Sequence, residues 1–229
     1  MRVIIIRHHA EDSPGFIAEA FAARGARIST HLFPAGGPLP GLDGADHVVV
    51  LGAVPSVYDD GLHRPWIEQE LAWLRLAHEA GLPILGICFG AQALCTVVGG
   101  QVVAADRKEV GWALVESHAP DEIPAGPWLQ FHGDRCLPPG EATILASNEI
   151  GVQAFTIGRH LGVQFHPEVD GEQLHGWLES GGADEAVRAG TDPHAFLART
   201  RAEEPAARVR ADQLVATALR LAARQVPAG

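Results

Sequence analysis

A cysteine lies between two glycines at the end of an apolar segment. Residues 86–90, GICFG, place Cys88 two residues from each glycine, a pattern typical of a sharp strand-to-helix turn that exposes a nucleophile. In such a turn the flanking residues approach each other closely, so both must be small. The helix N-terminus favours a thiolate, and the N–H of Phe89 can donate to an oxyanion. Cys88 is therefore the candidate nucleophile, with a buried structural cysteine as the alternative interpretation.

A histidine and a glutamate two residues apart could supply the base. His166 and Glu168 flank a proline, and side chains two apart in an extended chain project to the same side. Because a cysteine nucleophile needs an oriented base, we expect Glu168 to hold the His166 ring with its other nitrogen facing Cys88. A surface turn is the alternative. His8 and His9, which follow another apolar segment, are rival candidates for the base.

Alternating strands and helices must position these groups. Short apolar runs predict strands, and apolar residues at helical spacing predict the helices between them. The expected strands are residues 3–6, 28–32, 47–51 and 82–87, and the expected helices are 14–23, 65–80 and 91–98. This alternation predicts an α/β fold with a parallel sheet. Cys88 then follows the last strand of this parallel sheet, residues 82–87.

The second half of the chain has a different character. Short strands, some of them antiparallel, are expected at 101–103, 112–115, 143–145, 152–155 and 161–165. The last of these precedes His166 and could end at the same edge of the sheet as strand 82–87, which precedes Cys88. From about residue 172 the chain is helical, with a capping signal at Asp192 and a last helix beginning at Pro205. We expect one domain over residues 1–229, with no room for a second enzyme domain.

The charge balance excludes several classes of partner. Seventeen Lys and Arg residues stand against 28 Asp and Glu, which gives a net charge of −11. Because a surface this acidic binds polyphosphates poorly, we expect neither nucleic acid nor an anionic membrane as a partner. The uncharged segment 80–105 is long enough to span a bilayer, but its glycines and its proline predict shorter elements instead.

The cysteines and acids indicate neither a metal site nor an exported protein. Three cysteines are an odd number without metal-ligand spacing, and the N-terminus lacks a signal-peptide pattern, so we expect a reducing, cytoplasmic compartment. We expect Cys95 to be a core residue, and the sequence predicts no role for Cys136. The adjacent acids Asp59 and Asp60 lack a partner histidine. No cofactor and no metal are expected.

These motifs together resemble the class I (triad-type) glutamine amidotransferases, in particular stand-alone members similar to the glutaminase domain of GMP synthase. The similar stretches are LGAVPSVYD at 51–59, GICFGAQ at 86–92, EVGW at 109–112, HGD at 132–134 and HPE at 166–168. The resemblance covers most of the chain. It implies a three-layer, flavodoxin-like fold: an open, mostly parallel sheet with helices on both faces and additional antiparallel strands.

The resemblance also implies a role for each matching residue. Cys88 would attack the side-chain amide of L-glutamine and form a thioester, His166 would transfer the proton, and Glu168 would orient the histidine. Substrate binding would fall to Gln92, Gly133 and Asp134, and the oxyanion hole to Phe89, Gly52 and Ala53. The released ammonia would serve an acceptor or a synthetase partner on another chain.

One departure and two alternatives remain open. Many relatives have Gly-Gly-Pro where this chain has Gly52-Ala53-Val54. If the active loop needs a positive φ at residue 53, alanine opposes it, and basal activity is then weak or depends on a partner. The same triad also suits a γ-glutamyl peptide or amide hydrolase. A catalytically silent regulatory module is the third hypothesis, against which the complete triad argues.

Overall fold

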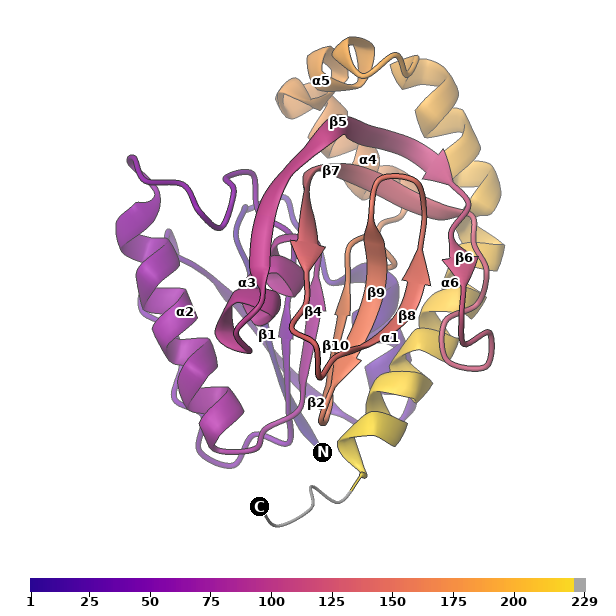
Figure 1. Cartoon of the computed structure of the whole chain (residues 1–229). Helices are drawn as coiled ribbons and strands as arrows, with labels where there is room; N and C mark the ends of the chain where they lie inside the picture. Colours follow the sequence, from indigo (N-terminus) through magenta and orange to yellow (C-terminus); the bar gives the residue numbers. More distant parts are fainter. Residues whose placement is uncertain (225–229) are drawn as a thin grey trace.

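The sheet is built around apolar strands that are buried on both faces. The computed structural model describes residues 1–224, in which ten strands form one curled sheet (Figure 1). Its N-terminal half consists of β1 (Arg2–Arg7), β2 (Arg27–Leu32), β3 (His47–Val50) and β4 (Ile84–Ile87), all parallel. The order β2-β1-β3-β4-β10 places β10 (His160–Val163) beside β4, again in parallel.

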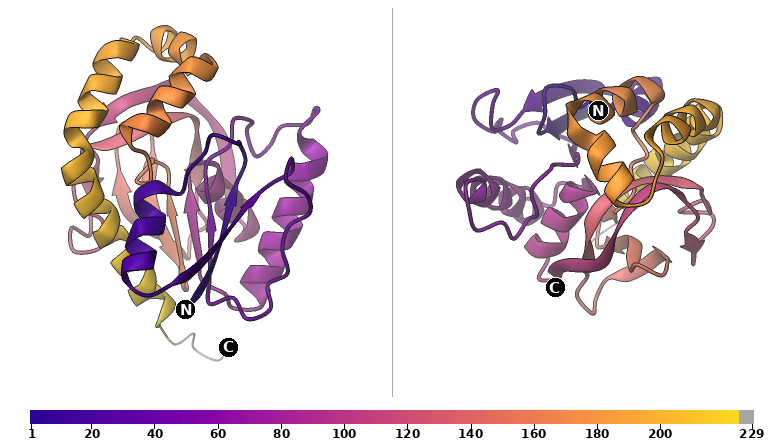
Figure 2. Two further views of the ribbon diagram at one scale, coloured as in Figure 1. Left: turned by 180° about the vertical axis from the view of Figure 1, so that it is seen from behind. Right: turned by 90° about the horizontal axis from the view of Figure 1, so that it is seen from above.

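Helices cover the two faces of this sheet. Side chains alternate along a strand, and in β1 Val3 and Ile5 pack into one core while Ile4 and Ile6 pack into the other. The first core also receives α1 (Gly15–Ala23), and the second receives α2 (Arg64–Glu79) and α3 (Phe89–Val97). Figure 2 shows these helices on opposite sides of the sheet. The layers are those of an α/β fold.

The second half adds antiparallel strands. The longest is β5 (Gln101–Ala113), which pairs with β7 (Trp128–Leu137) and arches with it over the sheet in Figure 1. The others are β6 (Glu116–Ser117), β8 (Thr143–Ser147) and β9 (Val152–Ile157), which pairs with β10. The sequence predicted two short strands where β5 is continuous, because a register shift between Ala104 and Glu109 interrupts its regular pattern. It did not predict β7.

The C-terminal helices belong to the same core. They are α4 (Gly171–Trp177), a π-helical turn (Leu178–Gly182), α5 (Ala183–Arg188) and α6 (Pro193–Ala222). The Asp192 carboxylate caps α6 by accepting from the N–H of Ala195 at 2.8 Å. The predicted helix start at Pro205 is wrong, since Pro205 lies inside α6. Packing on both sides of Pro205 offsets the hydrogen bond that it removes.

That packing joins α6 to the first helix. Leu214, Ala218 and Leu221 of α6 are buried in one core with Phe16 and Phe21 of α1. The two helices cover the same face of the sheet (Figure 2). In residues 1–224 we find no helix with the length and apolar character that a membrane crossing requires.

Candidate active site

Four neighbouring parallel strands bring the candidate residues together. In the order β1-β3-β4-β10, the carboxyl ends of these strands meet at one edge of the sheet. The segments that follow them carry His8, Gly52, Cys88 and His166, respectively. Residues far apart in sequence thus meet where α/β sheets place their ligand sites.

Cys88 lies on a strained turn between β4 and α3. Its φ of 52° and ψ of −108° make it the sole non-glycine residue with positive φ among residues 1–224. A Cβ at Gly86 would lie 2.4 Å from the Gly90 carbonyl oxygen, and a Cβ at Gly90 would lie 2.1 Å from that of Val50. Both flanking positions therefore require glycine, as the spacing predicted. The Cys88 N–H donates to the Val163 carbonyl at 2.8 Å, which ties the turn to β10.

The start of α3 supplies the electrostatic setting of the cysteine. Cys88 occupies the N-cap position and is only 6% exposed. The N-terminal amides of a helix lack intrahelical acceptors and carry partial positive charge. Phe89 opens the helix, so its N–H belongs to this group. This arrangement offers the N–H of Phe89 as one donor to a developing oxyanion.

His166 is bound to Glu168 and faces the cysteine. Its Nδ1 lies 2.8 Å from Oε1 of Glu168, and both side chains are at most 4% exposed. Because a carboxylate accepts, Nδ1 carries the proton and Nε2 is left without a hydrogen-bond partner among the described residues. Burial lowers the pKa of His166, but the charges of Glu168 and Cys88 outweigh burial and raise it well above its ordinary value. Trp177 packs edge-on against the ring, with centroids 5.1 Å apart.

The backbone of Glu168 is held by the start of α1. The N–H of Phe16 donates to the Glu168 carbonyl at 3.1 Å. Gly15 has a φ of 37°, and a Cβ there would come within 1.9 Å of the same carbonyl oxygen. Gly15 is thus required for the close approach that places the glutamate. The sequence pattern carried no signal for this contact beyond a glycine at the start of a helix.

Gly52 lies against both reacting side chains. A Cβ at this position would be 3.0 Å from Cε1 of His166 and 3.7 Å from Cβ of Cys88. The loop after β3 therefore borders both Cys88 and His166. Ala53, the next residue, has no positive φ in this conformation.

The rival bases predicted from the sequence lie elsewhere. Nδ1 of His8 is 2.7 Å from the Gly52 carbonyl oxygen, and its Nε2 is 2.8 Å from Oε2 of Glu70 on α2. Both ring nitrogens are therefore engaged, so His8 does not offer a free base to Cys88. His9 is exposed, and its ring accepts the N–H of Glu11 at 3.4 Å. Of the histidines predicted as bases, His166 is the one with an unpaired nitrogen at the cysteine.

The expected substrate-binding residues lie around this centre. Gln92 is buried one turn after Cys88, and its amide donates to Oε1 of Gln164 at 3.3 Å. Asp134, on β7, accepts from the Ser56 hydroxyl at 2.6 Å and from the Tyr58 hydroxyl at 2.7 Å. These two bonds join β7 to the loop that follows Gly52 and Ala53. No sequence pattern predicted the pairing of Asp134 with Ser56 and Tyr58.

A buried polar network fixes the neighbouring part of β7. Nε2 of His132 lies 3.1 Å from Oε2 of Glu109, and Asn148 donates to the other carboxylate oxygen at 2.7 Å. Burial raises the pKa of Glu109, but its hydrogen bonds with His132, Asn148 and Gln153 lower it below the ordinary value. Gly133 follows His132 and packs against Lys108, since a Cβ there would lie 3.1 Å from Cγ of that side chain. The network thereby fixes His132, the residue before Gly133, on β7.

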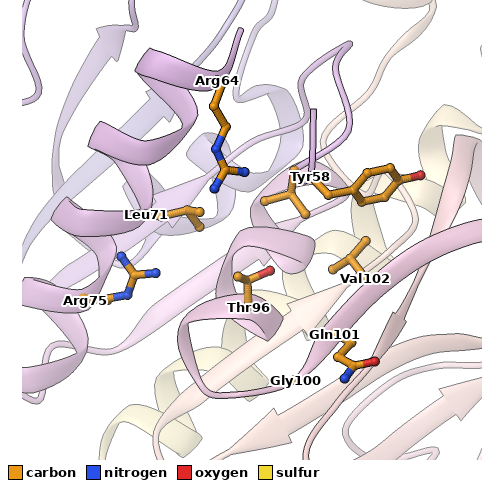
Figure 3. A pocket seen from close by; sticks show the side chains of 9 residues that line it. Tyr58, Arg64, Leu71, Arg75, Thr96, Gly100, Gln101 and Val102 are labelled. Atoms are coloured by element: carbon orange, nitrogen blue, oxygen red, sulfur yellow. The ribbon is translucent and has the colours of Figure 1, made fainter. Parts of the chain in front are cut away.

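A surface depression lies apart from the reacting groups. Figure 3 shows Arg64, Leu71 and Arg75 of α2 facing Thr96 of α3 across it, and neither Cys88 nor His166 lines it. In the part of the chain that the structure describes, no cluster of three or more His, Cys, Asp or Glu side chains could hold a metal ion.

Comparison with known proteins points in one direction. The family model described as "Glutamine amidotransferase class-I" matches residues 16–180. A glutamine-hydrolysing GMP synthase of Thermomicrobium roseum is 39% identical over 129 residues, which cover 53% of this chain and 23% of that protein. Its counterpart in Bartonella bacilliformis is 35% identical over 143 residues, covering 56% and 26%. The matched region thus spans about a quarter of these curated relatives.

Solved structures match over nearly the whole length. A glutamine amidotransferase of Thermotoga maritima superposes with a TM-score of 0.86 at 28% identity, covering 98% of this chain and 99% of the other. A glutamine amidotransferase of Methylobacillus flagellatus superposes with a TM-score of 0.85 at 21% identity, covering 98% and 96%, a level that speaks to the fold alone.

Proposed function

Because the chain belongs to the class I glutamine amidotransferase family, we propose that it hydrolyses the side-chain amide of L-glutamine through a cysteinyl thioester. The proposed catalytic residues are Cys88, His166 and Glu168. One observation carries the proposal: a strained, helix-capping cysteine meets the free nitrogen of a buried histidine whose other nitrogen is held by a glutamate. This is the geometry that a nucleophile with an oriented base requires.

The first half of the reaction forms the thioester. The Cys88 thiolate attacks the amide carbon of glutamine, and the carbonyl oxygen takes up the electron pair. When this tetrahedral intermediate collapses, the C–N bond breaks and Nε2 of His166 gives its proton to the departing nitrogen. The products are ammonia and a γ-glutamyl thioester on Cys88. The raised pKa of His166 suits this step, because the imidazolium is both the partner of the thiolate and the acid.

The second half returns the enzyme to its starting state. His166, now neutral, takes a proton from water as the water oxygen attacks the thioester carbon. The C–S bond breaks, glutamate leaves, and the thiolate–imidazolium pair is restored. Glu168 takes no part in bond making; it holds Nδ1–H at 2.8 Å and so keeps Nε2 directed at the sulfur and the substrate.

The remaining assignments follow from position. We propose that the N–H groups of Phe89 and Ala53 form the oxyanion hole, because Phe89 opens α3 and the Gly52 backbone borders both Cys88 and His166. Gln92 and the segment of Gly133 and Asp134 are proposed to bind the glutamine. We propose that the ammonia passes to a synthetase partner, since the curated relatives are named glutamine-hydrolysing GMP synthases.

The test measures ammonia and glutamate released from glutamine and from a panel of γ-glutamyl peptides and amides. We expect glutamine to be the preferred substrate and Cys88→Ala to abolish the release, with Cys95→Ala as a matched control on the same helix. A preference for a γ-glutamyl peptide would replace the substrate and keep the triad. Release that survives unchanged in Cys88→Ala would refute the proposal.

A further inference from the structure

A second buried histidine–carboxylate pair lies beside the proposed catalytic centre. His8 and Glu70 are joined at 2.8 Å, with side chains 4% and 0% exposed. A buried pair of this kind costs desolvation energy, and the triad makes no use of it. The His8 ring also packs against both Trp66 and Phe89, with ring centroids 5.4 Å and 5.1 Å away. Three side chains thus hold one imidazole in place.

The hydrogen bond to Gly52 fixes a proton on Nδ1 of this ring. A backbone carbonyl only accepts, so Nδ1 of His8 must donate to the Gly52 oxygen at 2.7 Å. Burial lowers the pKa of His8, but the charge and the hydrogen bond of Glu70, together with the bond to Gly52, raise it above the ordinary value. Nε2 faces a carboxylate oxygen of Glu70 at 2.8 Å, so both ring nitrogens are engaged.

His8 therefore touches both halves of the proposed oxyanion hole. Its ring packs on Phe89, and its Nδ1–H holds the carbonyl of the peptide that joins Gly52 to Ala53. In a trans peptide the C=O and the N–H point in opposite directions. The bond from His8 thus keeps the Gly52 oxygen turned toward His8 and directs the Ala53 N–H to the opposite side.

Resting on the proposed function, we propose that His8 is a positioning residue, held by Glu70, that keeps the Gly52–Ala53 peptide oriented for oxyanion binding. Ala53 reinforces the same orientation. Rotating this peptide by half a turn brings φ of residue 53 into the positive region, which a Cβ disfavours. In the observed orientation Ala53 has no positive φ. The histidine and the alanine therefore oppose the same flip.

The test separates the donor from the buried charge. Because removing one partner of a buried pair can unfold the chain, both test variants carry Glu70→Gln. They are His8→Asn/Glu70→Gln, in which the amide can replace Nδ1–H, and His8→Leu/Glu70→Gln, which has the same shape without a donor. A matched control is His31→Leu, on the neighbouring strand β2, whose ring bonds Ser29.

We expect the leucine variant to lose on the order of a hundredfold in kcat for glutamine relative to the asparagine variant, as when an oxyanion-hole donor is removed. KM should change little. Alkylation of Cys88 by iodoacetamide passes through no oxyanion, so its rate should be equal in both. Equal kcat values in the two variants would overturn the proposal. A fall in the alkylation rate of the leucine variant that matches its fall in kcat would also overturn it, because His8 would then act on the reactivity of the Cys88 thiol.

Two further measurements complete the test. The Gly52 carbonyl ¹³C resonance should shift in the leucine variant and stay near its wild-type position in the asparagine variant. This measurement tests the His8 contact even if the wild type fails to hydrolyse glutamine. That failure would refute the proposed function separately. Ala53→Gly should lower kcat by permitting the flip. A higher kcat would show that the active loop needs a positive φ at residue 53 and would overturn the proposed orientation.

Discussion

A single methyl group at Gly90 should damage both stability and catalysis. Gly90→Ala places a Cβ 2.1 Å from the Val50 carbonyl oxygen, about 0.9 Å short of the 3.0 Å below which Cβ contacts essentially never occur. The obstacle is backbone of a central strand, so no side chain can move aside. The start of α3 must shift by roughly an ångström, and Cys88 and Phe89 shift with it.

Two magnitudes follow from that displacement. Overpacking a buried site typically costs about 1–3 kcal/mol, and we expect the upper end because the contact is with backbone. A misplacement of about 1 Å at a reacting group costs on the order of a hundredfold in rate. Gly86→Ala, whose Cβ would lie 2.4 Å from the Gly90 oxygen, should behave similarly.

The assay combines urea unfolding with glutamine hydrolysis. Gly41→Ala is the matched control, since it is exposed, has no positive φ and would meet no atom within 4 Å; its free energy of unfolding should stay within about 0.5 kcal/mol of the wild type. If Gly90→Ala unfolds at the wild-type urea midpoint and keeps its kcat, the close approach of α3 to β3 is not what holds the turn.

Two pH-dependent predictions come from the buried histidines. Burial lowers the pKa of His166, and the charges of Glu168 and Cys88 raise it. Glu168→Gln should therefore lower the pKa of His166 and move the alkaline limb of the kcat/KM profile toward lower pH. The exposed control Glu172→Gln should leave that limb in place, and an unmoved limb in Glu168→Gln would contradict the prediction. Burial lowers the pKa of His47 from 6.5 to about 3, so the fold favours its neutral form. The contribution of His47 to the free energy of unfolding should be fully present above pH 6.5. It should fall by about 1.4 kcal/mol per pH unit from pH 6.5 toward pH 3, because only the unfolded chain binds the proton in that range. In His47→Leu, urea midpoints should depend less on pH over that range, and an equal slope would contradict the assignment.

The α/β fold and the family expected from the sequence are confirmed, and the reason is local patterning. Strands buried on both faces, such as β1 and β3, read as continuous apolar runs. By contrast, β7 buries Gln130 and His132 through hydrogen bonds to Gln153 and Glu109. Polar residues that are buried in pairs carry no apolar pattern, so this strand escaped prediction.

The candidate site divides in the same way. The spacing around Cys88 is a local pattern of a strand-to-helix turn, so it could be predicted. The contact of Gly90 with Val50, on another strand, could not. The meeting of Cys88 with His166 followed from both being placed after parallel strands. The pairing of His8 with Glu70, 62 positions away, and the contact of Gly15 with Glu168 depend on the packing of helices against loops. No local pattern encodes them.

The packing of α6 on α1 separates two kinds of boundary. The region shared with the family model ends at residue 180, whereas α6 begins at Pro193 and contributes Leu214 and Leu221 to the core around α1. A chain shortened to the shared region would expose the apolar face of the helix whose first turn holds the Glu168 carbonyl. The region matched by the family model is thus smaller than the packed core, because α6 lies outside that region and packs on the helix that holds the backbone of the proposed catalytic glutamate.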